Sequence, residues 1–158
     1  MACVCLDASL VVLWFLRQEL TPEADAVLDQ WRADDTDLIA PPLLMAEVPS
    51  VLRQAVHRGR ITSEEGDTAF ADFTGVGIRI AEPPGLLSRA WDLGKALNVP
   101  RLYDMFYVAL ADLERCELWT ADRHLVNLVK GRWPLARWLG EFSTQAETSE
   151  QQMEGGAT

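Results

Sequence analysis

Short apolar runs alternate with segments of helical periodicity along most of the chain. Apolar runs too short for helices predict strands, at residues 2–7, 38–40, 76–80 and 118–120. Longer segments with apolar residues three and four positions apart predict helices, at residues 10–17, 21–31, 41–57, 62–73, 86–97, 102–115 and 123–129. A last apolar segment at 135–139 leaves its type open. Strands that alternate with helices favour a parallel sheet, so the pattern predicts an α/β domain.

Polar residues and prolines mark where several of these helices begin. Thr21 precedes Pro22, which predicts a capping hydroxyl and a proline in the first helical turn. Thr62 stands three residues before Glu65, which predicts a capping box. Pro41-Pro42 is expected to open the third helix, in which Pro49 should cause a kink or delay the start.

The last part of the chain differs from the rest in composition. Residues 141–158 contain four glutamates and no basic residue, and they lack apolar periodicity. Such a segment buries too little apolar surface to offset the entropy lost on ordering. We therefore expect one folded domain at residues 1–141 and a disordered acidic tail at 142–158.

The overall composition narrows the class of protein. The 158 residues suit one domain, and 49% of them are hydrophobic, which excludes a chain that is disordered throughout. The three cysteines show no C-x-x-C spacing, which suits free thiols in a reducing cytoplasm. No apolar run is long enough for a membrane-spanning helix. We therefore expect a cytoplasmic protein.

The net charge of −10 disfavours nucleic-acid binding through bulk attraction. The charge is unevenly distributed, however, since residues 123–140 hold four basic residues and no acid. A local basic surface is therefore compatible with the acidic total.

Single carboxylates interrupt three apolar parts of the chain. Asp7 is the only charged residue among the first 16, and Glu47 is the only one between Leu38 and Leu52. Asp104 lies at the start of the helix that contains the apolar sequence LYDMFYVALA. Burying a bare carboxylate is very costly, so each of these acids needs a hydrogen-bond donor, a proton or a cation. Three such acids suggest one shared partner.

Their predicted positions bring these acids to one edge of the sheet. Asp7 ends the first strand, Asp122 follows the fourth, and Glu47 and Asp104 lie early in helices. Ligand sites in open parallel sheets form beyond the carboxyl ends of the strands. A set of oxygen ligands without His or Cys suits Mg²⁺ or Mn²⁺. Such a site favours metal-assisted hydrolysis of a phosphodiester.

Each acid also has an ordinary structural explanation. Asp7 and Asp122 could cap the helices that follow them. Glu47 could face solvent, and Asp104 could complement the dipole of its helix. The combination of all four is less easily explained in this way than any one member.

Four motifs in this order resemble the PIN-domain ribonucleases, especially VapC-type toxins of toxin–antitoxin pairs: CLDASLVV, PPLLMAEVPSVL, YDMFYVALA and LWTADRHL. The resemblance covers about residues 3–139 and implies a PIN-like three-layer α/β/α domain with a short central parallel sheet. It also implies that Asp7, Glu47, Asp104 and Asp122 bind divalent metal and that Ser9 and Thr120 support the site. It further implies RNA cleavage that leaves 5′-phosphate and 3′-hydroxyl ends, a homodimer, and inhibition by a small antitoxin protein.

The chain departs from the family pattern at two places. Pro49 stands where the family has a small or polar residue, which affects the expected geometry near Glu47. Some relatives carry a further acid after the last motif, where this chain has His124, Leu125 and Asn127. Asn127 is therefore only an outside candidate for the site.

The basic residues could rim the predicted site and contact RNA phosphates. The candidates are Arg53, Arg58, Arg60, Arg123 and Lys130. A solvated charged face explains them about equally well.

Two other functions are compatible with the sequence. His57 and His124 could catalyse RNA cleavage without metal, although each fits a solvated helix face better. The second alternative is a non-catalytic, Mg²⁺-binding receiver-like or protein-interaction module. A receiver needs a lysine just after a late strand, and neither Lys95 nor Lys130 fits that position.

Overall fold

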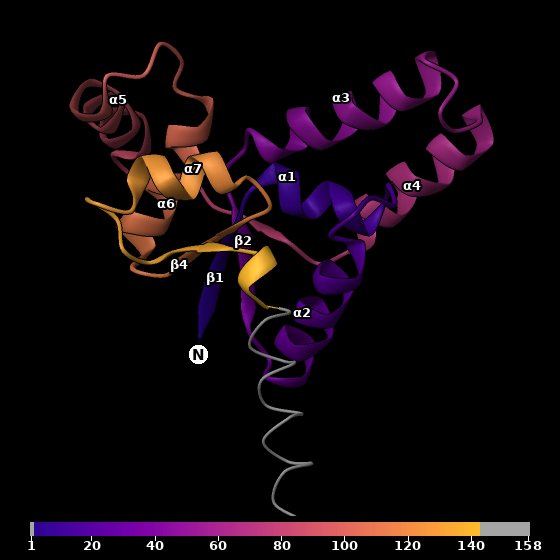
Figure 1. Ribbon diagram of the computed structural model, residues 1–158, viewed down its shortest axis with the longest axis horizontal. Helices are drawn as coiled ribbons and strands as arrows, with labels where there is room; N and C mark the ends of the chain where they lie inside the picture. Colours follow the sequence, from indigo (N-terminus) through magenta and orange to yellow (C-terminus); the bar gives the residue numbers. More distant parts are fainter. Residues whose placement is uncertain (1, 143–158) are drawn as a thin grey trace, which may run out of the picture.

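Five short strands form one parallel sheet in the computed structural model, which describes residues 2–142 (Figure 1). The strands lie in the order β3-β2-β1-β4-β5. Their bounds are β1 Cys3–Leu6, β2 Asp37–Ala40, β3 Arg79–Ile80, β4 Glu117–Thr120 and β5 Ala136–Trp138. The predicted parallel sheet is confirmed, and the open segment at 135–139 contains its fifth strand.

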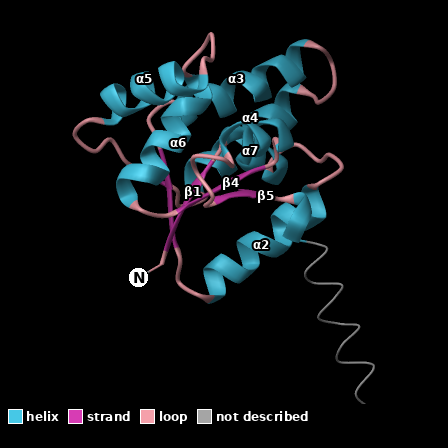
Figure 2. Cartoon of the chain, turned by 60° about the vertical axis from the view of Figure 1, so that its left-hand side comes forward, coloured by secondary structure: helices cyan, strands magenta, loops and turns pink. Residues whose placement is uncertain are grey.

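Helices lie on both sides of this sheet, as Figures 1 and 2 show. Helix α6 packs against β1 and β4 with α5 beside it, and α3 pairs with α4. The helices are α1 Ala8–Val11, the short 3₁₀ helix η1 Val12–Trp14, α2 Thr21–Ala33, α3 Leu44–His57, α4 Ser63–Gly75, α5 Leu86–Leu97, α6 Tyr103–Glu114 and α7 Arg123–Val129. The predicted three-layer α/β/α architecture is therefore confirmed.

The central strands are buried on both faces. Cys5, Leu6, Ile39 and Leu118 have no exposed surface. Strands covered by helices on both faces read as continuous apolar runs, because neither face meets water. This burial explains why the sequence signal for these strands was strong.

The strand order reverses between β1 and β4. Strand β1 pairs with β2 on one side and with β4 on the other, while β3 and β5 form the two edges. The crevice at such a reversal, outside the carboxyl ends of the strands, is where open α/β sheets bind ligands. Asp7 follows β1 directly, and Asp122 comes two residues after β4.

The first predicted helix, at 10–17, is wrong in its bounds. Helix α1 begins at Ala8, directly after Asp7, and is followed by η1, which ends at Trp14. The indole Nε1 of Trp14 donates a hydrogen bond of 2.8 Å to the carbonyl of Ala24. This contact holds the last residue of η1 against α2, so tertiary packing, which the local pattern does not reveal, decides where the helix ends.

The structure agrees only in part with the two helix N-termini predicted at Thr21 and Thr62. Helix α2 starts at Thr21 with Pro22 in its first turn, but the Thr21 hydroxyl accepts from the Gln18 amide instead of capping the helix. The capping role predicted for Thr21 is therefore wrong. The predicted capping box of α4 is confirmed, since Thr62 and Glu65 bond to each other's backbone amides.

Pro49 does not interrupt α3. The helix begins at Leu44, later than the predicted opening at Pro41-Pro42, and continues through Pro49 to His57. The predicted strand at 76–80 is reduced to the exposed residues Arg79 and Ile80. Both residues lie on the edge strand, which has only one neighbour.

The described part of the chain ends at Phe142, whose ring centroid lies 6.3 Å from that of Trp119 in β4. The prediction assigned Phe142 to the tail. The rest of the predicted disordered tail, residues 143–158, lies outside the described residues. No described helix is long and apolar enough to cross a membrane.

Candidate active site

Asp7 is a buried carboxylate held at the end of β1. Its side chain is 4% exposed, and its Oδ2 accepts hydrogen bonds from Ser9 at 2.5 Å and from Thr120 at 2.7 Å. Although Asp7 stands at the N-cap position of α1, its side chain makes no capping hydrogen bond. Burial raises the pKa of Asp7, while the two hydroxyl donors act in the opposite direction.

The hydroxyls of Ser9 in α1 and Thr120 at the end of β4 connect these two elements beside Asp7. Their oxygens lie 3.1 Å apart, so the two side chains contact each other as well as Asp7. The Ala121 amide donates to Ser9 at 3.1 Å, and the Asp122 amide donates to Thr120 at 2.9 Å. The network therefore fixes the segment after β4 relative to Asp7, and the structure brings both predicted supporting residues to it.

Glu47 lies in the first turn of α3 and carries a buried oxygen without a partner. Its Oε1 has no hydrogen-bond partner, and the nearby hydroxyl of Tyr107 is likewise buried without one. Burial and the negative charges of Asp7 and Asp104 raise the pKa of Glu47 to about 7, while the neighbouring hydroxyl of Tyr107 acts in the opposite direction. A carboxylate in this state is available to a proton or a cation.

Asp104 lies in the first turn of α6 and is exposed to solvent. Its side chain makes no hydrogen bond or ion pair with any described residue. Partial loss of hydration and the charges of Asp7 and Asp122 raise its pKa. Asp104 therefore faces the same group of carboxylates from a second helix.

Asp122 caps α7 and also belongs to this group. Its Oδ1 accepts from the amides of His124 at 2.8 Å and Leu125 at 3.3 Å. The structural explanation, a helix cap, is therefore correct for Asp122. The cap uses one carboxylate oxygen only, and the charge of Asp122 still raises the pKa of both Asp7 and Asp104.

The structure thus brings the four predicted acids within electrostatic range of one another. Burial first, and then the negative charges of the neighbouring acids, raise the pKa values of Asp7, Glu47 and Asp104. As the side chains stand, no three Asp, Glu, His or Cys residues among residues 2–142 are arranged to hold a metal ion. The described site is therefore a cluster of neighbouring carboxylates that do not have metal-binding geometry as they stand.

Tyr107 is a site residue that the sequence analysis did not select. It lies one helical turn after Asp104 on α6, and its side chain is fully buried. Burial, together with the negative charges of Glu47 and Asp7, raises the pKa of its hydroxyl. The available signal was its polar tip within the apolar sequence YDMFYVALA, which the sequence analysis treated as core.

Three of the predicted RNA-binding arginines lie along and after α3. Arg58 and Arg60 line one cavity, which also contains residues that follow η1. Arg53 lines a separate pocket formed by α3 and α4. The structure therefore does not gather the three arginines on one surface.

The remaining candidates for RNA binding, Arg123 and Lys130, lie at the two ends of α7. The guanidinium of Arg123 stacks over the ring of Trp138, 4.8 Å from its centroid. Lys130 follows the last residue of α7 and is exposed, as is Asn127. Arg123 is thus next to Asp122, whereas Lys130 lies at the opposite end of the helix.

The two alternative functions find no support in the placement of their residues. His57 ends α3 and His124 is the second residue of α7, and both side chains are exposed. Lys95 is exposed near the end of α5, so it does not follow a strand as a receiver lysine would.

Comparison with known proteins agrees with this geometry. A protein of Mycobacterium bovis named VapC ribonuclease Mb0985 is 31% identical over 98 residues, which cover 62% of this chain and 75% of that protein. A Mycobacterium tuberculosis protein named Ribonuclease VapC9 shows the same identity, 31%, over 98 residues and the same coverage. The family model for the PIN domain matches residues 4–130, a range that contains all four acids. Because this match spans most of the chain, the protein belongs to the PIN domain family.

Proposed function

We propose that this protein is a metal-dependent endoribonuclease and the toxin of a toxin–antitoxin pair. One observation carries the proposal: Asp7, Glu47, Asp104 and Asp122 converge where the strand order reverses, and three of them have raised pKa values. Groups of repelling carboxylates at the end of a sheet are typical of functional sites rather than of stable cores. The family membership and the ribonuclease names of the two relatives support the same conclusion.

The chemistry of these residues fits a hard divalent cation, Mg²⁺ or Mn²⁺. The four side chains offer only carboxylate oxygens, which such cations prefer. Glu47 Oε1 is buried without a hydrogen-bond partner, and a cation would satisfy it. A cation would also offset the repulsion that raises the pKa values of Glu47 and Asp104. Because no ready-made cage exists among the described residues, binding requires side-chain adjustment.

Three of the acids have distinct roles in the proposed reaction. Asp7 is held in one orientation by Ser9 and Thr120, so it supplies a fixed negative charge at the centre of the site. Glu47 carries a buried oxygen, Oε1, without a hydrogen-bond partner, so it would hold the cation from α3. Asp104 is exposed in the first turn of α6, so it stays accessible from solvent. A bound divalent cation would activate water and offset the charge of the phosphodiester.

The proposal extends to two protein partners. As the toxin of a pair, the chain would bind a cognate antitoxin protein in the cytoplasm and would form a homodimer. The described surface offers exposed apolar side chains for such contacts, since Leu87 is 67% exposed and Trp91 is 59% exposed. These two residues lie four positions apart on α5 and therefore on one face of the helix.

Cleavage of RNA by the purified full-length protein tests the proposed function. The protein should cleave RNA in Mg²⁺ or Mn²⁺, lose activity in EDTA and regain it when the metal is restored. The products should carry 5′-phosphate and 3′-hydroxyl ends. Asp104→Asn and Glu47→Gln should abolish cleavage, whereas Asp25→Asn, which changes an acid on α2, should not. Cleavage that persists in EDTA would contradict the mechanism.

A further inference from the structure

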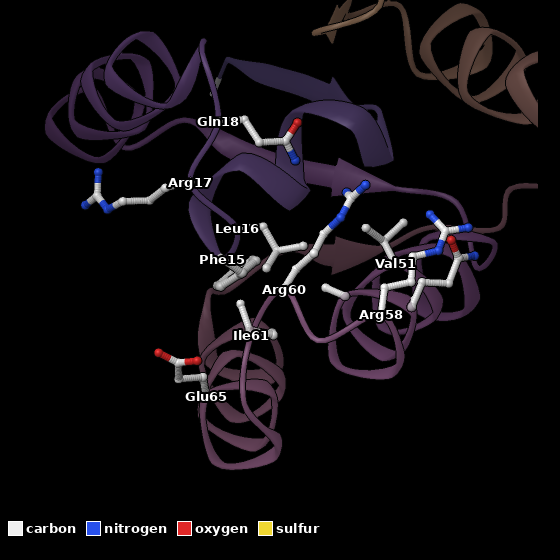
Figure 3. A pocket seen from close by; sticks show the side chains of 11 residues that line it. Phe15, Leu16, Arg17, Gln18, Val51, Arg58, Arg60, Ile61 and Glu65 are labelled. Atoms are coloured by element: carbon white, nitrogen blue, oxygen red, sulfur yellow. The ribbon is translucent and has the colours of Figure 1, made fainter.

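A cavity of about 590 Å³ lies between the chain after η1, the middle of α3 and the segment before α4 (Figure 3). The apolar part of its lining comes from Phe15 and Leu16 on one side and from Val51 and Ile61 on the other. None of the four carboxylates of the site lines this cavity. It is therefore distinct from the carboxylate site itself.

Two arginines give this cavity a positive charge on an acidic protein. Figure 3 shows Arg60 reaching past Leu16 and Val51 toward Gln18, while Arg17 points away. The side chains of Arg58 and Arg60 form no ion pair or hydrogen bond with any described residue. The acid in the lining, Glu65, has its Oε2 bound by the Thr62 amide in the capping box. The two guanidinium groups are therefore available to an anion.

Amide side chains complete the polar part of the lining. Gln18 and Gln54 both line the cavity and are exposed. A carboxamide offers a donor and an acceptor, which together can pair with the edge of a nucleobase. The lining therefore combines cations for phosphate, amides for base edges and an aromatic ring, Phe15, against which a base can pack.

Both walls of the cavity lead directly back to the carboxylate site. On α3, Glu47 is followed at helical spacing by Val51, Gln54 and Arg58, so one face of the helix carries the acid and then the cavity wall. The rise of an α-helix places these cavity residues about 6 to 17 Å from Glu47 along the axis. The opposite wall, beginning at Phe15, follows α1 and η1, which start directly after Asp7.

We propose that this cavity is a subsite for single-stranded RNA, in which Arg58 and Arg60 bind phosphates and a nucleotide adjoining the cleaved bond enters the cavity. The inference rests on the proposed ribonuclease function and adds a specificity-determining contact to it. Continuity of both walls with the acids favours the substrate strand over a protein segment as the occupant. Single-stranded RNA is favoured over a duplex because an unstacked base can enter a cavity of this kind.

Variants of the two arginines test the subsite. Arg58→Gln/Arg60→Gln should raise KM for a single-stranded RNA oligonucleotide by roughly tenfold or more, with kcat changed much less, since charged hydrogen bonds to phosphate are lost. The same double change in the inactive Asp104→Asn protein should weaken RNA binding by a similar factor. It should also reduce the slope of log affinity against log salt by about 1.4, since each phosphate contact to a single strand contributes about 0.7.

Arg53→Gln is the matched control. Arg53 lies on α3, shortly before the two cavity arginines in the chain, and is also exposed, but it lines the other pocket, between α3 and α4. Arg53→Gln removes one charge, and it should raise KM clearly less than the loss of either cavity arginine does. Because all three side chains are exposed, the variants should melt at the wild-type temperature.

Three outcomes would overturn the inference. If wild type cleaves RNA and the double variant has the KM of Arg53→Gln, the subsite is wrong while the ribonuclease function stands. If poly-L-glutamate binds the inactive protein through Arg58 and Arg60, while RNA binding does not depend on these two residues, the occupant is an acidic protein segment. If wild type cleaves no RNA in Mn²⁺, the proposed function fails and the subsite fails with it.

Discussion

The hydroxyl of Thr120 donates a hydrogen bond of 2.7 Å to Oδ2 of Asp7, although the two residues are 113 positions apart in the chain. The contact crosses from β4 to the end of β1, where the strand order reverses. Thr120 is fully buried and also accepts from the Asp122 amide at 2.9 Å. One threonine therefore positions two of the four acids.

Removing this hydroxyl should impair both stability and activity. Thr120→Val leaves the Asp122 amide without its acceptor and removes one donor from Asp7, so the free energy of unfolding should fall by about 1–3 kcal/mol. Chemical denaturation measures this loss. RNA cleavage should fall as Asp7 loses its fixed orientation. Thr120→Ser, which keeps the hydroxyl, should retain most of the stability and most of the RNA cleavage. Equal defects in the two variants would argue against a positioning role.

The raised pKa of Glu47 predicts how stability changes with pH. Its ordinary pKa is 4.5, and in the folded protein it is about 7, so between these values the folded state binds more protons than the unfolded state. The free energy of unfolding should therefore fall as the pH rises from 4.5 to 7, and this contribution should level off above 7.

Glu47→Gln isolates this contribution. In EDTA the variant should gain roughly 1–2 kcal/mol relative to wild type at pH 8, because the half-exposed side chain is partly screened by water, and little at pH 5. Denaturation of both proteins at the two pH values measures the difference. A difference that is the same at pH 5 and pH 8 would show that Glu47 does not titrate in this range.

Two variants of Asp122 should distinguish its role as a helix cap from the role of its charge. Asp122→Asn keeps an oxygen for the amides of His124 and Leu125, so its melting temperature should stay close to that of wild type. Asp122→Ala loses the cap and should be less stable by about 0.5–2 kcal/mol. RNA cleavage should be lost in both. A stable but fully active Asp122→Asn protein would remove this residue from the proposed site.

The C-terminal boundary of the domain is testable by truncation. Deleting residues 144–158 should leave the melting temperature nearly unchanged, because that sequence is polar and lacks apolar periodicity. Phe142→Ala should cost about 0.5–1.5 kcal/mol through loss of its ring contact with Trp119. A large decrease in melting temperature on truncation would show that the tail contributes to the folded domain.

The parts of the fold that depend on long apolar runs were predictable from the sequence. The central strands and α5, Leu86–Leu97, were predicted closely, because burial on both faces or a full amphipathic face leaves a strong local signal. The short strand β3 and the 3₁₀ helix η1 were not. Their bounds depend on contacts with distant segments, such as the bond from Trp14 to Ala24.

The candidate site was predictable where a charge stood alone among apolar residues. Asp7, Glu47 and Asp104 were selected in this way, and the structure brings their side chains within electrostatic range of one another. Tyr107 was missed because an aromatic residue in an apolar helix gives no local sign that its hydroxyl points at acids. Arg53 and Arg58 line different pockets because they face different neighbouring segments. Helix periodicity alone does not predict which segments these are.

The dependence of melting temperature on Mn²⁺ tests most directly whether the acids form one metal site. The series compares wild type, Asp7→Asn and Asp104→Asn, each in EDTA and in Mn²⁺. In EDTA both variants should be as stable as wild type or more so, because a raised pKa means that each carboxylate is costly when charged. In Mn²⁺ at about 100 times its Kd, wild type alone should gain about 2.7 kcal/mol. Equal responses to Mn²⁺ from all three proteins would contradict a shared metal site.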